Sequence, residues 1–102
     1  MIKQASPEDV LTLRGKVRLI DVREPAEYTG ELGHVDGAEL VPLATVPAAA
    51  AKWDKQAPIV CICRSGGRSG RAAEALAGLG FTDVTNMVGG MLAWNEKKLP
   101  VA

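Results

Sequence analysis

The chain has 102 residues, with 12 basic and 12 acidic side chains and 47% hydrophobic residues. This length fits one globular domain with a single core, and we treat residues 1–102 as that domain. The even charge balance argues against a nucleic-acid or membrane-surface protein, because both need a basic excess. No stretch is apolar enough to span a membrane, and the first residues lack a signal-peptide core, so we expect a cytoplasmic protein.

The first half of the chain alternates helix and strand signals. Ser6 begins a segment typical of a helix start, with a proline and two acids after it, and Gly15 is expected to end that helix. Residues 17–22 are apolar and β-branched, which indicates a buried strand. A short helix is predicted at 24–28, and a turn with a brief strand at 33–42.

The second half repeats this alternation. A helix capped by its first residue, threonine, is predicted at 45–53, and a fully buried strand at 58–62. A helix follows from about residue 68 and stops at a glycine, residue 80. Its apolar face is expected to carry Ala72, Ala75, Leu76 and Leu79. Residues 83–90 predict a last strand with a glycine turn, and residues 91–98 a last helix.

Strands separated by helices pair in parallel through right-handed crossovers. We therefore predict an α/β fold of three layers, with a central parallel sheet of about five strands and helices on both faces. Binding sites in such sheets lie beyond the carboxyl ends of the strands. Three segments follow predicted strands, 21–24, 63–68 and 89–90, and chemistry is expected where they meet.

The cysteines and the single histidine limit the chemistry. Cys61 and Cys63 are too close together to form a framework of disulfides, and with His34 they are too few for a structural zinc site. We expect no metal and no cofactor. Same-face positions of one strand lie roughly 7 Å apart, too far for easy bridging, so Cys61 is expected to be a small buried side chain, with a redox partner as the lesser alternative. His34 follows a glycine in a turn, where a local hydrogen bond is expected.

The segment 63–70, CRSGGRSG, leaves a buried strand and enters a helix. Such a loop presents unpaired N–H groups, and the helix dipole adds partial positive charge. Gly66 and Gly67 are expected to let successive N–H groups converge on an anion, and the thiolate of Cys63 is one such anion. Lowering a thiol pKa from about 8.5 to about 6.5 raises the thiolate fraction at neutral pH from about 3% to roughly three quarters. The loop would thus supply a nucleophile without a base.

Two other interpretations of this segment stay open. The glycines could serve only the turn, with the arginines simply solvated. A nucleic-acid patch is disfavoured, because no aromatic residue is interleaved with the arginines.

Four motifs, in this order and covering nearly the whole chain, resemble those of the rhodanese-like sulfurtransferases. Residues 19–28, LIDVREPAEY, resemble the family's early Asp-Val-Arg motif, and 33–42, GHVDGAELVP, its Gly-His-x-x-Gly-Ala turn. Residues 60–69, VCICRSGGRS, are similar to its active-site loop, and 88–94, VGGMLAW, to its closing Gly-Gly-x-x-x-Trp motif.

The resemblance implies that Cys63 becomes a persulfide. Its thiolate would take the outer sulfur of thiosulfate or a similar small donor and pass it to cyanide or a thiol. An alternative is a carrier module that receives sulfur from a sulfur-relay protein. A third is a phosphatase or arsenate reductase of the same fold, but those carry five residues between cysteine and arginine. Four residues separate Cys63 from Arg68, which is the sulfurtransferase length in the family.

Supporting roles are expected for the rest of the loop and for the end of an earlier strand. The substrate-binding cradle would comprise Arg64, Ser65, Gly66, Gly67, Arg68 and Ser69. Arg64 could attract an anionic donor or be a free surface arginine. Arg68 is expected to shape the loop or to pair with an acid at a strand end, for which Asp21 is the candidate. Alternatively, Asp21 and Arg23 form a structural pair that fixes the loops.

Overall fold

The computed structural model describes residues 2–102, in which five strands form one parallel sheet in the order β1-β5-β4-β2-β3. The strands are β1 Lys3–Ala5, β2 Arg18–Asp21, β3 Glu39–Leu40, β4 Ile59–Ile62 and β5 Val84–Met87. The helices are α1 Pro7–Leu13, α2 Pro25–Tyr28, α3 Val46–Ala50, α4 Gly67–Gly78 and α5 Gly90–Glu96, with a 3-10 turn η1 at Leu43–Thr45. No helix among residues 2–102 is long and apolar enough to cross a membrane.

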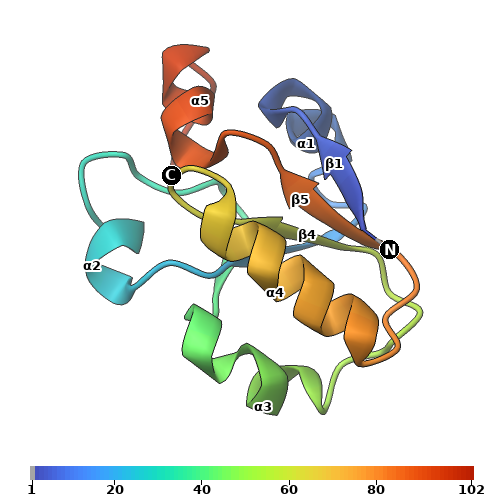
Figure 1. Cartoon of the computed structure of the whole chain (residues 1–102). Coiled ribbons are helices and arrows are strands. Elements are labelled where there is room, and N and C mark those ends of the chain that lie inside the picture. The colour runs from blue at the N-terminus through green and yellow to red at the C-terminus, as the bar shows by residue number, and fades with distance from the viewer. Residues whose placement is uncertain (1) are drawn as a thin grey trace.

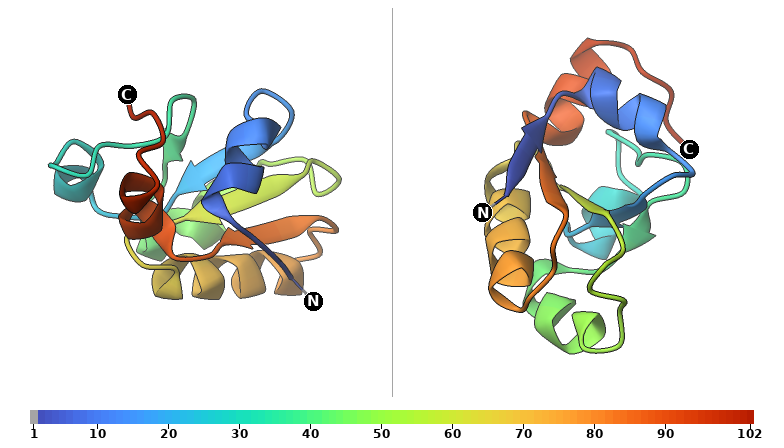
Figure 2. Two further views of the ribbon diagram at one scale, coloured as in Figure 1. Left: turned by 90° about the horizontal axis from the view of Figure 1, so that it is seen from above. Right: turned by 90° about the vertical axis from the view of Figure 1, so that its right-hand side faces the viewer.

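Helices cover both faces of the sheet (Figures 1 and 2). Helices α1 and α5 lie against one face, and α3 and α4 against the other. Short α2 lies near the carboxyl ends of the strands, away from these two layers. The predicted three-layer α/β fold with a parallel five-stranded sheet is confirmed.

Strand β4 lies at the centre of the sheet and contributes to both cores. All four of its residues are buried, because neighbouring strands flank it and helices cover it on both sides. Val60 and Ile62 pack in the core that contains Trp94 of α5. Cys61 packs in the opposite core, beneath α3 and α4, and Cys63 joins it there. The expectation that the two cysteines share one side is therefore confirmed.

Strand β1 was not predicted from the sequence. It pairs in parallel with β5 at the edge of the sheet, Lys3 opposite Thr85. Lys3 and Gln4 are exposed, so the strand has no apolar pattern that would reveal it. The strand forms because its backbone pairs with that of β5.

The predicted apolar face of α4 was partly wrong. Ala72 and Leu76 are buried as expected, but Ala75 is exposed and Leu79 is 44% exposed just beyond the helix end. The other buried positions of α4 are Ser69 and Ala73. Because Ser69 is buried, the buried face of α4 lies closer to the start of the helix than the apolar residues predicted. A serine gives no apolar signal in the sequence, so this shift could not be predicted.

The predicted helix 45–53 is shorter than expected. The 3-10 turn η1 comes first, and α3 covers only Val46–Ala50. The hydroxyl of Thr45 donates to the carbonyl of Pro42 and does not cap α3. The side chain of Thr45 thus bonds within the 3-10 turn, and α3 begins only after that turn.

The carboxyl ends of three strands bring the segments 21–24, 63–68 and 89–90 together. The N–H of Val22 donates to the carbonyl of Ile62 over 2.8 Å, and that of Met91 donates to the carbonyl of Cys63 over 2.9 Å. The meeting point expected from the topology is therefore present, with Cys63 at its centre.

Candidate active site

Cys63 directly follows β4 and lies at the start of a loop that curls around its sulfur. The residue is 1% exposed. The N–H of Gly66 donates to Sγ over 3.0 Å, and the hydroxyl oxygen of Ser69 lies 3.3 Å from Sγ. The structure therefore places one backbone N–H and one hydroxyl within hydrogen-bonding distance of the sulfur.

These donors change the acidity of Cys63. Burial acts to raise the pKa of the Cys63 thiol, but hydrogen bonds from the Ser69 hydroxyl and from the N–H groups of Ser69, Gly66 and Ser65 outweigh it. The pKa is lowered below its ordinary value. A hydrogen-bonded anion is favoured because the donors replace lost water.

Cys61 has the opposite environment. It is fully buried, and burial together with the neighbouring Cys63 raises the pKa of its thiol to about 12. Both cysteines are free thiols. Cys61 therefore stays protonated and unreactive at neutral pH, in agreement with the expected packing role.

The two loop glycines differ in what they allow. Gly66 has φ +106° and precedes α4, a conformation that favours glycine and aims its N–H at Sγ. Gly67 is the first residue of α4, and a Cβ added there would meet nothing within 4 Å. Only Gly66 is needed to form the cradle, so the expectation for Gly67 was wrong in this respect.

Asn86 of β5 extends the network and was not predicted. The Ser69 hydroxyl donates to Asn86 Oδ1 over 2.5 Å. Asn86 Nδ2 donates in turn to Gln4 Oε1 and to the carbonyl of Gly66, which fixes the amide orientation. Because a hydroxyl has one hydrogen, Asn86 Oδ1 and the sulfur of Cys63 compete for it. The available signal for this role was the presence of the polar residue Asn86 inside a strand whose four residues are all buried.

The start of α5 holds the outer side of the loop. The N–H groups of Met91 and Leu92 donate to the carbonyls of Cys63 and Arg64 over 2.9 and 3.0 Å. Gly90 has φ +57°, and a Cβ there would lie 2.5 Å from both carbonyl oxygens. The glycine turn lets α5 bind the loop carbonyls at close range.

Asp21 pairs with Arg23. Both side chains are fully buried, and the guanidinium donates to both carboxylate oxygens over 2.8 to 3.2 Å. Arg23 also donates to the carbonyls of Glu27 and Gly33. The pair ties the end of β2 to α2 and to the following turn, which matches the structural alternative.

Arg68 does not pair with Asp21, so that expectation was wrong. Its guanidinium donates to both carboxylate oxygens of Glu27 in α2 over 2.7 and 2.8 Å. Asp21 is already occupied by Arg23, two residues along the chain, whereas Arg68 leaves the first turn of α4 toward α2. The Arg68 hydrogen bond lowers the pKa of Glu27 to about 2.

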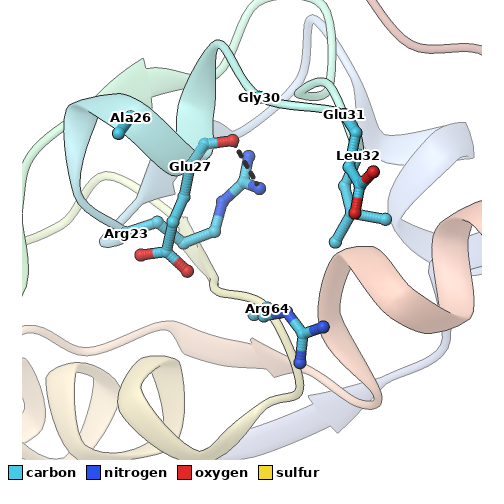
Figure 3. A pocket seen from close by; sticks show the side chains of 7 residues that line it. All are labelled: Arg23, Ala26, Glu27, Gly30, Glu31, Leu32 and Arg64. Carbon is cyan, nitrogen blue, oxygen red and sulfur yellow. Dashed lines mark hydrogen bonds between the residues drawn. The ribbon is translucent and has the colours of Figure 1, made fainter.

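A pocket of about 210 Å³ lies beside the loop (Figure 3). Arg64 is exposed and borders this pocket opposite the segment that follows α2. The lining residues are Arg23, Ala26, Glu27, Gly30, Glu31, Leu32 and Arg64.

His34 has a local role. Its Nδ1 lies 3.0 Å from the carbonyl of Tyr28, and its ring stacks on that tyrosine at 3.7 Å between centroids. Among residues 2–102, no three His, Cys, Asp or Glu side chains gather as metal ligands would.

Comparison with known proteins supports one family. The family model of the rhodanese-like domain matches residues 6–97. The chain belongs to the rhodanese-like family. Its rhodanese fold is shared by a rhodanese-like domain protein from Staphylococcus aureus, whose crystal structure is 27% identical in sequence. That match has a TM-score of 0.83 and covers 99% of each chain.

Three relatives of this chain carry different names. Uncharacterized protein YqhL of Bacillus subtilis is 35% identical over 97 residues, covering 95% of this chain and 75% of that protein. Thiosulfate sulfurtransferase GlpE of Pseudomonas entomophila is 34% identical over 95 residues, 92% and 85% of the two chains. Putative sulfur carrier protein YrkF of Bacillus subtilis is 38% identical over 81 residues, 79% of this chain but 43% of that protein.

Proposed function

We propose that this rhodanese is a sulfurtransferase that carries sulfur as a persulfide on Cys63. The observation that carries the proposal is the set of donors on one sulfur, the N–H of Gly66 and the hydroxyl of Ser69, together with the lowered pKa of that thiol. A lowered pKa raises the fraction of Cys63 present as thiolate, which is the nucleophile that sulfur transfer needs.

In the first half-reaction, the Cys63 thiolate attacks the outer sulfur of thiosulfate or a similar donor. The S–S bond of thiosulfate breaks, its electron pair leaves with sulfite, and a new S–S bond forms at Sγ. The donors that hold the thiolate are then available to the persulfide anion. The name of the relative from Pseudomonas entomophila supports thiosulfate as the donor.

In the second half-reaction, cyanide or a thiolate attacks the outer sulfur of the persulfide. The electron pair of the broken S–S bond returns to Sγ, which regenerates the thiolate. No oxidant or metal is required, because the sulfur atom passes from one nucleophile to another without net oxidation or reduction.

A second candidate is a persulfide carrier fed by a partner protein. The relative named as a putative sulfur carrier favours it. Such a module would use the same Cys63 cradle and would have little activity with small donors.

An oxyanion-processing phosphatase is disfavoured. Only four residues separate Cys63 from Arg68, and the Arg68 guanidinium is committed to Glu27. It is therefore not free to hold the oxygens of a phosphate.

Steady-state kinetics test the proposal. Varying thiosulfate at several fixed cyanide concentrations should give parallel double-reciprocal lines, because sulfite leaves before the acceptor binds. The Cys63→Ala variant should have no turnover. Sulfur uptake from a cysteine desulfurase without thiosulfate turnover would favour the carrier, and hydrolysis of an aryl phosphate without sulfur uptake would contradict both.

A further inference from the structure

We propose that the pocket bordered by Arg64 and Glu31 binds the sulfur acceptor, and that it favours a small thiol carrying both an ammonium and a carboxylate group. This inference rests on the proposed persulfide chemistry of Cys63. It adds a substrate class and a specificity-determining residue, Glu31, that the transfer chemistry itself does not require.

The place and size of the pocket suit a small acceptor. Arg64, which borders it, is bonded directly to Cys63 in the chain, and the opposite wall is the segment after α2 that carries Glu31 and Leu32 (Figure 3). The volume of about 210 Å³ is below the roughly 300–1,000 Å³ of pockets for drug-sized ligands. A molecule of amino-acid size is therefore appropriate.

Two charges in the pocket have no partner. Arg64 and Glu31 are both exposed, and within residues 2–102 neither side chain makes a hydrogen bond or an ion pair. The other charged lining residues are occupied, since Arg23 binds Asp21 and Glu27 binds Arg68. The free charges are thus one cation and one anion, on facing walls of the pocket.

Part of the pocket lining is apolar. Ala26, Gly30 and Leu32 contribute no charged or hydrogen-bonding side chain to the lining. A short carbon skeleton would rest there, with its carboxylate at Arg64 and its ammonium at Glu31.

The charge pattern fits the acceptor better than the donor. Thiosulfate carries two negative charges, so Glu31 would repel it, whereas Arg64 alone would attract it. Cyanide is too small to contact both walls. A zwitterionic thiol satisfies both charges and brings a thiolate toward the persulfide. That thiolate attacks the outer sulfur, the S–S bond to Sγ breaks, and the product is the persulfide of the acceptor plus the Cys63 thiolate.

The test compares three acceptors that share a thiol and differ in charge: cysteine, cysteamine with only the ammonium, and 3-mercaptopropionate with only the carboxylate. The full chain is first treated with thiosulfate, and intact mass establishes the persulfide. The kcat/KM for each acceptor is then measured for the wild type, Glu31→Gln and Arg64→Gln. Each variant is compared with the wild type on the same acceptor, so differences in thiol reactivity cancel.

We expect Glu31→Gln to lower kcat/KM about two- to fivefold for cysteine and cysteamine and not for 3-mercaptopropionate, as one exposed charge contact would. Arg64→Gln should lower it for cysteine and 3-mercaptopropionate and not for cysteamine. Glu31→Gln should leave the kcat/KM of thiosulfate unchanged or raise it.

Matched controls are Glu74→Gln and Arg71→Gln, two exposed charges of α4 outside the pocket, which should leave all three acceptors unchanged. Equal effects of a pocket variant on all three acceptors, or an effect of Glu31→Gln on the thiosulfate step alone, would overturn the inference. Failure to form any persulfide would instead refute the proposed function.

Discussion

The reactivity of Cys63 depends on the few hydrogen bonds that reach its sulfur. Ser69→Ala removes the hydroxyl donor, so we expect the pKa of Cys63 to rise by about one unit, the size of one charge-assisted hydrogen bond. The measurement is the pH dependence of alkylation by iodoacetamide. Cys61 does not interfere, because it is buried and its thiol has a pKa of about 12.

Ser65→Ala is the matched control for that experiment. Ser65 contributes to the cradle through its backbone N–H, and its side chain is exposed. Removing the Ser65 hydroxyl should leave the pH dependence of Cys63 alkylation unchanged. Equal shifts in both serine variants would show that the hydroxyl of Ser69 has no special role.

Asn86 gives a second prediction at this scale. Asn86→Asp places a carboxylate where the amide oxygen accepts the hydrogen of Ser69, so that hydrogen is held away from the sulfur and a negative charge is added nearby. The pKa of Cys63 should rise by about one unit or more. Thr85→Val, at the neighbouring and equally buried position of β5, is the control. An unchanged alkylation profile in Asn86→Asp would remove Asn86 from the network.

Among the elements, the contact between α5 and the loop determines the loop's backbone. Gly90→Ala would place a Cβ against the carbonyls of Cys63 and Arg64 at a positive φ. We expect Gly90→Ala to lower the free energy of unfolding, measured by urea titration, by about 2–4 kcal/mol. Gly78→Ala, a helical position of α4 with open space, should instead raise it by about 0.5–1 kcal/mol. Similar stability of the two variants would contradict this view of Gly90.

The ion pair between α2 and α4 makes stability depend on pH. Arg68 lowers the pKa of Glu27 from 4.5 to about 2. A lowered carboxylate pKa stabilises the fold above about 4.5, and the contribution is lost as pH falls toward 2. Glu27→Gln should therefore cost about 1 kcal/mol at neutral pH, reduced by solvent screening, and progressively less toward acid.

Urea unfolding of the wild type and of Glu27→Gln, repeated between about pH 7 and pH 3, measures this difference. The more exposed pair of Glu8 with Lys97 provides the control variant, Glu8→Gln, which should show the smaller effect. A Glu27→Gln deficit that stays constant with pH would mean that the ion pair is not its cause.

At the scale of the whole molecule, the order of strands and helices could be predicted from the sequence because it depends on local patterns. The apolar run of β4 and the glycine-rich loop after it indicated both the sheet and the position of Cys63. Edge strand β1 could not be predicted, since Lys3 and Gln4 carry no apolar pattern.

Contacts between distant segments were also beyond prediction. The pair of Arg68 with Glu27 joins residues 41 positions apart, and the bond from Ser69 to Asn86 spans 17 positions. Both depend on how α2 and β5 lie around the loop, which no local pattern contains. The candidate nucleophile was therefore predictable, whereas the partners of its cradle were not.

The assignment of the persulfide to Cys63 is tested most directly by the intact mass of the protein after incubation with thiosulfate and removal of excess donor. The wild type and Cys61→Ala should each gain the mass of one sulfur atom, which cyanide then removes. Cys63→Ala should gain none. Sulfur uptake by Cys63→Ala, or its loss in Cys61→Ala with Cys63 intact and the fold retained, would contradict the assignment of the persulfide to Cys63.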